Sequence, residues 1–168
     1  MLFRSVLAGY TNSGKSTLMN RLTHSDVLSE NKLFATLDPT TRQLKLTNQE
    51  TVLITDTVGF IQKLPHHLIK AFQATLEGIS EADFILHVID VSADKVQEMI
   101  ETSQEIFDEL NAEDIPQLFV FNKCDKIKNL DRVKSKLELF SPSIYISALN
   151  DSDMEPLFQS IEIGRAHV

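Results

Sequence analysis

Residues 9–16 read GYTNSGKS and follow an apolar run, LFRSVLA at residues 2–8. The spacing of the glycines, the lysine and the last serine is that of a phosphate-binding loop, because the glycines let the backbone curl with its N–H groups inward. Lys15 would reach the β- and γ-phosphates of a nucleotide, and the Ser16 hydroxyl would bind Mg²⁺. The run before the loop is typical of a strand, and SGKSTLMNRLT opens a helix, as such a loop requires. The stretch therefore predicts a P-loop domain of the α/β class.

Apolar runs and helical patterns alternate along the rest of the chain. Residues 24–40 show no clean period, and a loop is expected there. N-Q-E separates two strand patterns, which predicts a hairpin with one antiparallel edge strand. The other strands are mostly apolar and separated by helices, which predicts a mostly parallel sheet in a three-layer P-loop NTPase fold. Strands are expected at residues 2–8, 42–47, 51–56, 84–90, 117–122 and 143–147, and helices from residue 15 and at 66–77, 94–111, 129–139 and 153–162.

The composition limits the class of protein. The chain has 168 residues, 42% of them hydrophobic, a net charge of −8 and one cysteine, Cys124. This length suits one domain with its own core, and the single cysteine fits a reducing compartment, by default the cytoplasm. No apolar run reaches the roughly 18 residues of a membrane span. The acidic balance argues against sequence-specific DNA binding or a direct RNA-binding role, and we expect a monomer.

Two further motifs follow expected strands, where ligands of parallel sheets bind. Asp56 begins D-T-V-G, in which the carboxylate can hold Mg²⁺ through a water and the Gly59 N–H can reach the γ-phosphate. N-K-C-D follows at 122–125. A carboxylate at Asp125 can accept hydrogen bonds from N1–H and N2–H₂ of guanine, which adenine lacks, and leaving it unpaired rejects ATP. The two motifs predict a guanine-nucleotide site.

The neighbours of these motifs complete the predicted site. Asn122 is expected to tie its loop to the phosphate loop, and the stem of Lys123 to cover the base. S-A-L at 147–149 follows the next expected strand, where the Ala148 N–H could meet guanine O6. With this fourth motif in order, the domain is expected to span residues 1–162.

The chain resembles the G domain of the HflX family, translation-associated GTPases related to the Obg group. GYTNSGKSTLMNRLT (9–23), LFATLDPTTR (33–42) and DTVGFIQKLPHHLIKAFQATLE (56–77) carry the resemblance, which runs from about residue 3 to residue 162. It implies a Ras-like G domain and, for the parent protein, a contact with the large ribosomal subunit. It also implies that Thr36 ligates Mg²⁺ and senses the γ-phosphate. The run S-A-L-N-D-S-D-M departs from the family pattern because it lacks a glycine.

The motifs and the resemblance together define the expected residues. The expected catalytic residues are Lys15, Thr36, Gly59 and Asn12, and the expected Mg²⁺ ligands are Ser16, Thr36 and Asp56. The expected nucleotide contacts are Gly9, Tyr10, Thr11, Asn12, Ser13, Gly14, Lys15, Ser16, Thr17, Phe34, Ala35, Thr36, Leu37, Asp38, Asp56, Thr57, Val58, Gly59, Asn122, Lys123, Asp125, Ser147, Ala148 and Leu149.

Phe60 follows the D-T-V-G glycine, where other GTPases carry the glutamine that orients the attacking water. The resemblance implies that an apolar residue is normal here, so hydrolysis must use other groups. Asn12 lies where potassium-activated GTPases carry an asparagine whose amide oxygen holds K⁺, a cation that would offset transition-state charge. The alternative is that Asn12 only stabilises the loop by local hydrogen bonds. Intrinsic turnover is expected to be slow.

Two functions of different classes fit these residues. The leading interpretation is Mg²⁺-dependent hydrolysis of GTP to GDP and phosphate, used as a switch on the ribosome. The alternative is a GTP- and GDP-binding regulatory module that hydrolyses little and signals through ordering of its switch loops. An ATPase is disfavoured by Asp125. His87 lies in an apolar run and is expected to be a core histidine rather than a base.

The last residues, IGRAHV at 163–168, are expected to be a non-native tail. They match one reading frame of a common sequencing-adapter sequence and add no pattern, so they are excluded from fold reasoning. The tail and the short lead into the phosphate loop indicate a fragment of a longer protein.

Overall fold

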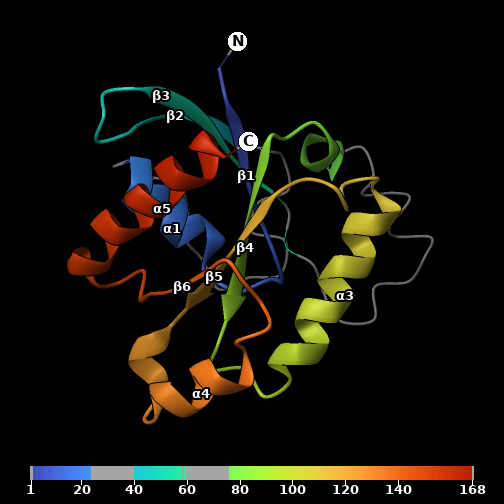
Figure 1. Cartoon of the computed structure of the whole chain (residues 1–168), viewed down its shortest axis with the longest axis vertical. Helices are drawn as coiled ribbons and strands as arrows, with labels where there is room; N and C mark the ends of the chain where they lie inside the picture. The colour runs from blue at the N-terminus through green and yellow to red at the C-terminus, as the bar shows by residue number, and fades with distance from the viewer. Residues whose placement is uncertain (1, 24–39, 58, 60–75, 168) are drawn as a thin grey trace.

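The computed structural model describes residues 2–23, 40–57, 59 and 76–167 (Figure 1). In these residues six strands form one sheet in the order β2-β3-β1-β4-β5-β6. Neighbouring strands are parallel except β2 and β3, which form an antiparallel hairpin at one edge. The strands are β1 (Arg4–Ala8), β2 (Thr40–Lys45), β3 (Thr51–Asp56), β4 (Phe84–Asp90), β5 (Gln117–Asn122) and β6 (Ser143–Tyr145). The predicted sheet is confirmed.

Helices lie on both faces of this sheet (Figure 1). On one face are α1 (Lys15–Thr23) and α5 (Met154–Ala166), and on the other are α3 (Val96–Glu109), α4 (Leu130–Lys136) and the helical residues 76–80. Two short 3₁₀ turns, η1 (Cys124–Lys126) and η2 (Asp151–Asp153), follow β5 and precede α5. The three-layer α/β architecture predicted from the sequence is thereby confirmed.

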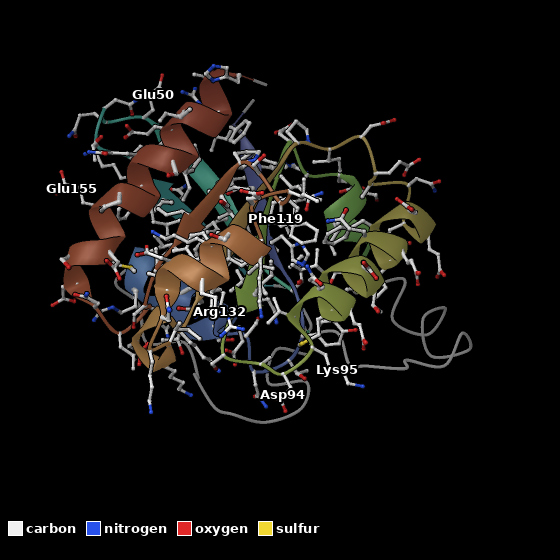
Figure 2. All side chains as sticks on the ribbon, turned by 60° about the horizontal axis from the view of Figure 1, so that its bottom comes forward. Glu50, Asp94, Lys95, Phe119, Arg132 and Glu155 are labelled. Carbon is white, nitrogen blue, oxygen red and sulfur yellow. The ribbon has the colours of Figure 1, made fainter. Side chains whose placement is uncertain are left out.

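The side chains of β4 show why the layers form. Leu86 and Val88 pack with α1 and α5, whereas Ile85 and Ile89 pack on the opposite face with α3. This is the alternation of a strand buried on both sides. Phe119 of β5 likewise lies between α3 and α4 (Figure 2). The core therefore centres on β1, β4 and β5.

Some boundaries differ from those expected. β2 begins at Thr40, two residues before the expected strand, and β6 ends at Tyr145. The loop expected at 24–40 lies almost entirely outside the described residues, and so does most of the helix expected at 66–77, of which residues 76 and 77 are helical.

The last helix is longer than expected and bonds to the β2–β3 turn. α5 continues past residue 162 to Ala166, and Gly164 packs so closely on the Phe84 ring that a Cβ would overlap it. In the turn, the Thr47 N–H donates to Glu162 Oε1 at 2.6 Å, and Glu50 forms an ion pair with Arg165. The first residues of the predicted tail are therefore part of the helix, and its non-native origin stays a prediction.

The strand registers bring the candidate motifs to one edge of the sheet. Leu7 of β1 is level with Asp56 of β3, and Asp90 of β4 is level with Asn122 of β5. Loops that leave the carboxyl ends of parallel strands meet at this edge, which is where such sheets bind ligands.

Candidate functional site

The loop between β1 and α1 has backbone angles that require its glycines. Gly9 and Gly14 have φ values of 150° and 102°, and Asn12 adopts the left-handed conformation at 62°. A Cβ on Gly9 would collide with the Val88 carbonyl, and a Cβ on Gly14 with the side-chain amide of Asn122. The sequence spacing that predicted a curled loop therefore has a steric cause in this structure.

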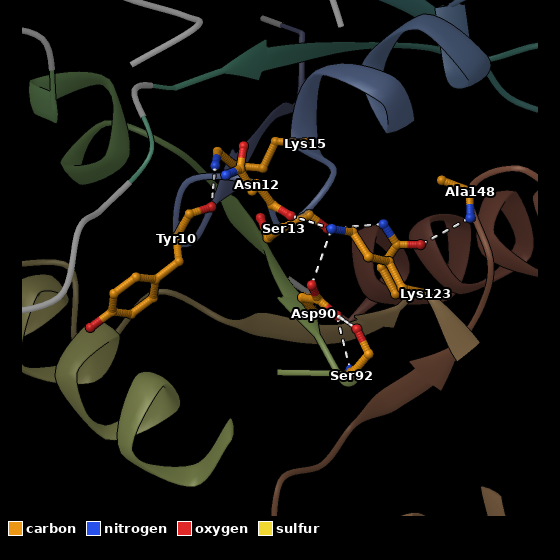
Figure 3. Close-up of polar contacts among 9 residues, drawn as sticks. Tyr10, Asn12, Ser13, Lys15, Asp90, Ser92, Lys123 and Ala148 are labelled. Atoms are coloured by element: carbon orange, nitrogen blue, oxygen red, sulfur yellow. Dashed lines mark hydrogen bonds and ion pairs between the residues drawn. The ribbon is translucent and has the colours of Figure 1, made fainter. Parts of the chain in front are cut away.

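Lys15 is held over the loop from the start of α1 (Figure 3). Its ammonium group donates to the carbonyl oxygens of Gly9 at 3.1 Å and Tyr10 at 2.8 Å. Burial lowers the Lys15 pKa to about 8, and the nearby Asp56 carboxylate opposes that shift. A buried cation at a helix N-terminus, next to the first-turn N–H groups, is suited to bind phosphate.

Asp56 and Ser16 meet beside this lysine. The Ser16 hydroxyl donates to Asp56 Oδ2 at 2.9 Å, and the Asp56 side chain is fully buried at the end of β3. A hydroxyl and a carboxylate are both ligands that Mg²⁺ prefers, so these two residues fit a magnesium site. No group of three or more His, Cys, Asp and Glu side chains suited to a metal occurs in the described part of the chain.

The D-T-V-G segment touches the phosphate loop through Gly59. A Cβ on Gly59 would lie 2.7 Å from Thr11 Cγ2 and 2.8 Å from Thr11 Cα, so only glycine fits without displacing the loop. Thr57 is turned the other way, because its hydroxyl donates to the Leu7 carbonyl at 2.6 Å inside the sheet. Only the backbone of Thr57 is therefore placed to serve the nucleotide.

Asn122 joins the two loops that the sequence predicted it would join. Its Nδ2 donates to the Ser13 carbonyl at 2.9 Å, and its Oδ1 accepts from the Ala148 N–H at 2.9 Å. The predicted tie between N-K-C-D and the phosphate loop is confirmed. The Ala148 N–H, expected to face guanine O6, bonds to Asn122 in this structure and would have to share that bond to reach the base.

A cavity of about 290 Å³ opens next to this connection. Asp125 lies in η1, and its side chain is exposed. The residue just before η1 is Lys123, which has a left-handed backbone (φ 66°). The cavity borders the phosphate loop on one side and the S-A-L segment on the other. Its lining residues are Gly14, Thr17, Asn122, Lys123, Asp125, Lys126, Ser147, Ala148 and Leu149.

The S-A-L segment is fixed without the glycine that the family pattern carries. The Ser147 N–H donates to Asp153 Oδ2 at 2.8 Å, and the Asn150 side chain accepts from the Ser152 N–H at 3.2 Å. These side-chain-to-backbone bonds hold the loop, which has no glycine. Asp153 is absent from the expected contacts, and the pattern that could have found it is a carboxylate at the start of a predicted helix.

Other expected contacts are placed differently or fall outside the described residues. The Tyr10 ring is buried among apolar residues that include Leu76 and Phe107, so only its backbone faces the loop. The switch residues Phe34, Ala35, Thr36, Leu37 and Asp38, with Val58 and Phe60, lie outside the described residues.

Two titratable residues near the site are structural. His87 is 1% exposed and packs against the Phe107 and Phe119 rings, and burial lowers its pKa to about 4, so it is a neutral core histidine as predicted. Burial raises the pKa of Cys124 to about 11, which keeps this thiol protonated and unreactive at neutral pH.

Comparison with known proteins agrees with this geometry. A family model described as 50S ribosome-binding GTPase matches residues 4–123, which include the phosphate loop, Asp56 and Asn122. The chain belongs to this GTPase family. Its resemblance to HflX proteins is also confirmed, because curated relatives share close to half of its residues.

Two of these relatives are GTPase HflX of Alkalihalophilus pseudofirmus and of Escherichia coli. The first is 48% identical over 161 residues, which cover 93% of this chain and 36% of the relative. The second is 42% identical over 156 residues, 92% of this chain and 37% of the relative. This G domain thus spans a little over a third of the length of the relatives that it matches.

A solved structure shares the fold. The GTP-binding protein from the archaeon Sulfolobus solfataricus, in complex with GDP, superposes with a TM-score of 0.79 at 32% identity, over 98% of this chain and 53% of that one. The described part of this G domain has no helix that is long and apolar enough to cross a membrane.

Proposed function

We propose that this domain binds GTP and GDP and hydrolyses GTP with Mg²⁺, as the switch of a ribosome-associated protein. The observation that carries the proposal is the convergence of four groups at one edge of the sheet. Lys15, Ser16 and Asp56 lie together on the phosphate side, and Asp125 lines the adjoining cavity. The family description and the names of the relatives support both GTP hydrolysis and a ribosomal partner.

In this proposal each side of the site has its own task. Lys15 leaves the carbonyls of the loop and pairs with the β- and γ-phosphates, while the N–H groups at the start of α1 hold their oxygens. Asp125 accepts two hydrogen bonds from guanine in the cavity. The stem of Lys123, which lines the same cavity, covers the base. The Ser147, Ala148 and Leu149 segment closes the far side.

Magnesium would be held by Ser16 and Asp56, with Thr36 as the switch ligand that the family implies. Bound Mg²⁺ offsets negative charge on the phosphates during transfer. The chain's own part is to orient these oxygens, which the Ser16–Asp56 hydrogen bond at 2.9 Å already does.

The Asn12 side chain supports the potassium hypothesis over local hydrogen bonding. It is exposed, and among the described residues no hydrogen bond of its amide group is found. Its backbone carbonyl accepts from the Lys123 ammonium at 2.5 Å. The side-chain oxygen is therefore available to hold K⁺ beside the phosphates.

GTP turnover in matched potassium and sodium buffers at fixed Mg²⁺ tests this proposal. We expect faster turnover in potassium for the wild type, because the cation supplies charge that a glutamine and an arginine supply elsewhere. Asn12→Ala should remove the gain while keeping GDP affinity within about threefold, since its backbone contacts persist. Equal rates in both salts would eliminate the potassium role.

The regulatory module that binds but barely hydrolyses GTP is the second candidate, because Phe60 takes the place of the catalytic glutamine. Adding large ribosomal subunits separates the two. Stimulated turnover supports a ribosome-activated GTPase, whereas nucleotide-dependent subunit binding without turnover supports the module.

We expect the domain to be a cytoplasmic monomer, to be checked by sedimentation and by fractionation of cells.

A further inference from the structure

Asp90 ends β4 at the same edge of the sheet as the nucleotide motifs but belongs to none of them. Its Oδ2 lies 3.1 Å from the Lys123 ammonium, and both side chains are mostly buried, with 19% and 21% exposed. The same ammonium donates to the Asn12 carbonyl at 2.5 Å (Figure 3). Lys123 therefore bridges the end of β4 and the phosphate loop.

The Asp90 carboxylate is held by Ser92 as well as by Lys123. Its Oδ1 accepts from the Ser92 N–H at 2.9 Å and from the Ser92 hydroxyl at 2.5 Å (Figure 3). The backbone beside it is also fixed, because the Val91 N–H donates to the Asn122 carbonyl at 3.1 Å. One oxygen is thus anchored locally, and the other is directed at the lysine.

The Asp90–Lys123 pair is connected to the phosphate loop through Asn12. This residue has the left-handed backbone, and its carbonyl is turned outward to the Lys123 ammonium. Charge-assisted bonds of this kind are stronger than neutral ones. If Asp90 lost its charge, the ammonium would keep a single carbonyl partner in a mostly buried place, and an incompletely paired cation moves toward water.

We propose that Asp90 is a positioning residue for the nucleotide, acting through Lys123 on the phosphate loop and on the base cavity. The proposal rests on the nucleotide binding proposed above. Asp90 itself touches neither site. Its role is to keep the Lys123 ammonium on the Asn12 carbonyl, so that the stem of Lys123 stays along the base and the loop keeps its curl.

Dissociation of fluorescent N-methylanthraniloyl-GDP, chased with unlabelled GDP, measures this role in the full chain. Asp90→Asn keeps an oxygen for Ser92 and removes the charge, and it should speed dissociation about tenfold, as expected for breaking a largely buried charge pair. Asp94→Asn is the matched control, because Asp94 is an exposed carboxylate just before α3 (Figure 2) and should leave the rate unchanged.

A double-mutant cycle with Lys123→Met separates positioning from a merely structural effect. Lys123→Met keeps most of the stem and removes the ammonium. If Asp90 acts through Lys123, Asp90→Asn adds less than about twofold in that background. A full tenfold effect there, or no effect in the wild-type background, overturns the proposal.

Two further measurements distinguish a loss of the fold from a loss of the proposed role of Asp90. Thermal unfolding of each variant shows whether the fold is retained, and Ser92→Ala, which spares the charge pair, should change dissociation less than Asp90→Asn. If the wild type itself does not bind the fluorescent GDP, the proposed function fails. If the wild type binds and Asp90→Asn dissociates at the same rate, only the role of Asp90 fails.

Discussion

The base side and the phosphate side of this site are held in place by different chemistry. On the base side, neutral amide and anchored carboxylate groups fix the loops. Asn122 joins the Ser13 carbonyl to the Ala148 N–H, and Asp153 holds the Ser147 N–H. A base can enter the cavity while these bonds stay in place, and the Ala148 N–H would share its bond to reach guanine O6.

On the phosphate side, two ammonium groups fix the loop. Lys15 holds the Gly9 and Tyr10 carbonyls, and Lys123 holds the Asn12 carbonyl. The Lys15 ammonium can exchange its carbonyls for phosphate oxygens, which are the stronger partners, whereas Lys123 stays on the Asn12 carbonyl beside Asp90. The base is thus held by a rigid template and the phosphates by a cradle in which Lys15 changes partners, so only the phosphate side should respond strongly to pH and salt.

The largest expected effect comes from removing the group that connects the two sides. Asn122→Ala leaves the Ser13 carbonyl and the Ala148 N–H buried without this partner, at about 1–3 kcal/mol for each group. We expect the free energy of unfolding to fall by about 2–4 kcal/mol and GDP affinity by about a hundredfold. Denaturant unfolding and GDP titration measure both.

Asn150→Ala is the control for that variant, because Asn150 is exposed and its side chain accepts hydrogen bonds from Ser152 of its own turn. It should change stability by less than about 1 kcal/mol. Equal losses for the two variants would contradict the view that one side chain couples both halves of the site.

The pH dependence of GDP binding should come from the phosphate side. Burial lowers the pKa of Lys15 to about 8, and phosphate favours its charged form. Above this pKa the protein must take up a proton to bind, so affinity falls as pH rises, by roughly fivefold between pH 8 and 9. Below pH 8 the lysine is already charged and the affinity levels off.

Titration of Lys15→Met over the same pH range checks the assignment. This variant should bind GDP weakly, without the additional loss above pH 8. A loss of the same size in the variant would place the proton elsewhere, for example on the guanine.

The smallest effect is expected on the base side. Asp153→Ala removes the acceptor of the Ser147 N–H, a bond worth about 0.5–1.5 kcal/mol. GDP affinity should fall about threefold to tenfold, by the same factor at low and high salt, because the lost bond lies away from the phosphates. A loss of GDP affinity that depends strongly on salt would contradict the difference proposed between the two sides.

Local motifs made much of this site predictable. The glycine spacing at 9–16 fixes the curl of the loop through sterics, and N-K-C-D follows a strand whose apolar run is unmistakable, so the tie through Asn122 could be predicted. The sheet was predictable for the same reason, since apolar strands and helices alternate along the chain.

Contacts that depend on tertiary placement could not be predicted. Asp90 is one of 24 acidic residues, and its pairing with Lys123 requires β4 and β5 to be level neighbours. The Tyr10 side chain was expected at the nucleotide because it belongs to the motif, yet its ring packs in the apolar core. The bond from the Ala148 N–H to Asn122 could not be predicted either, because it joins the ends of two strands that are separate in the sequence.

The hydrogen bonds on the carbonyls of the phosphate loop also bear on the speed of recognition. Because Lys15, Lys123 and Asn122 hold these carbonyls in the folded chain, the entropy of ordering the loop is lost when the chain folds. The nucleotide meets a preorganised receptor, so encounter should be limited by diffusion and the exchange of ion partners rather than by a search among loop conformations.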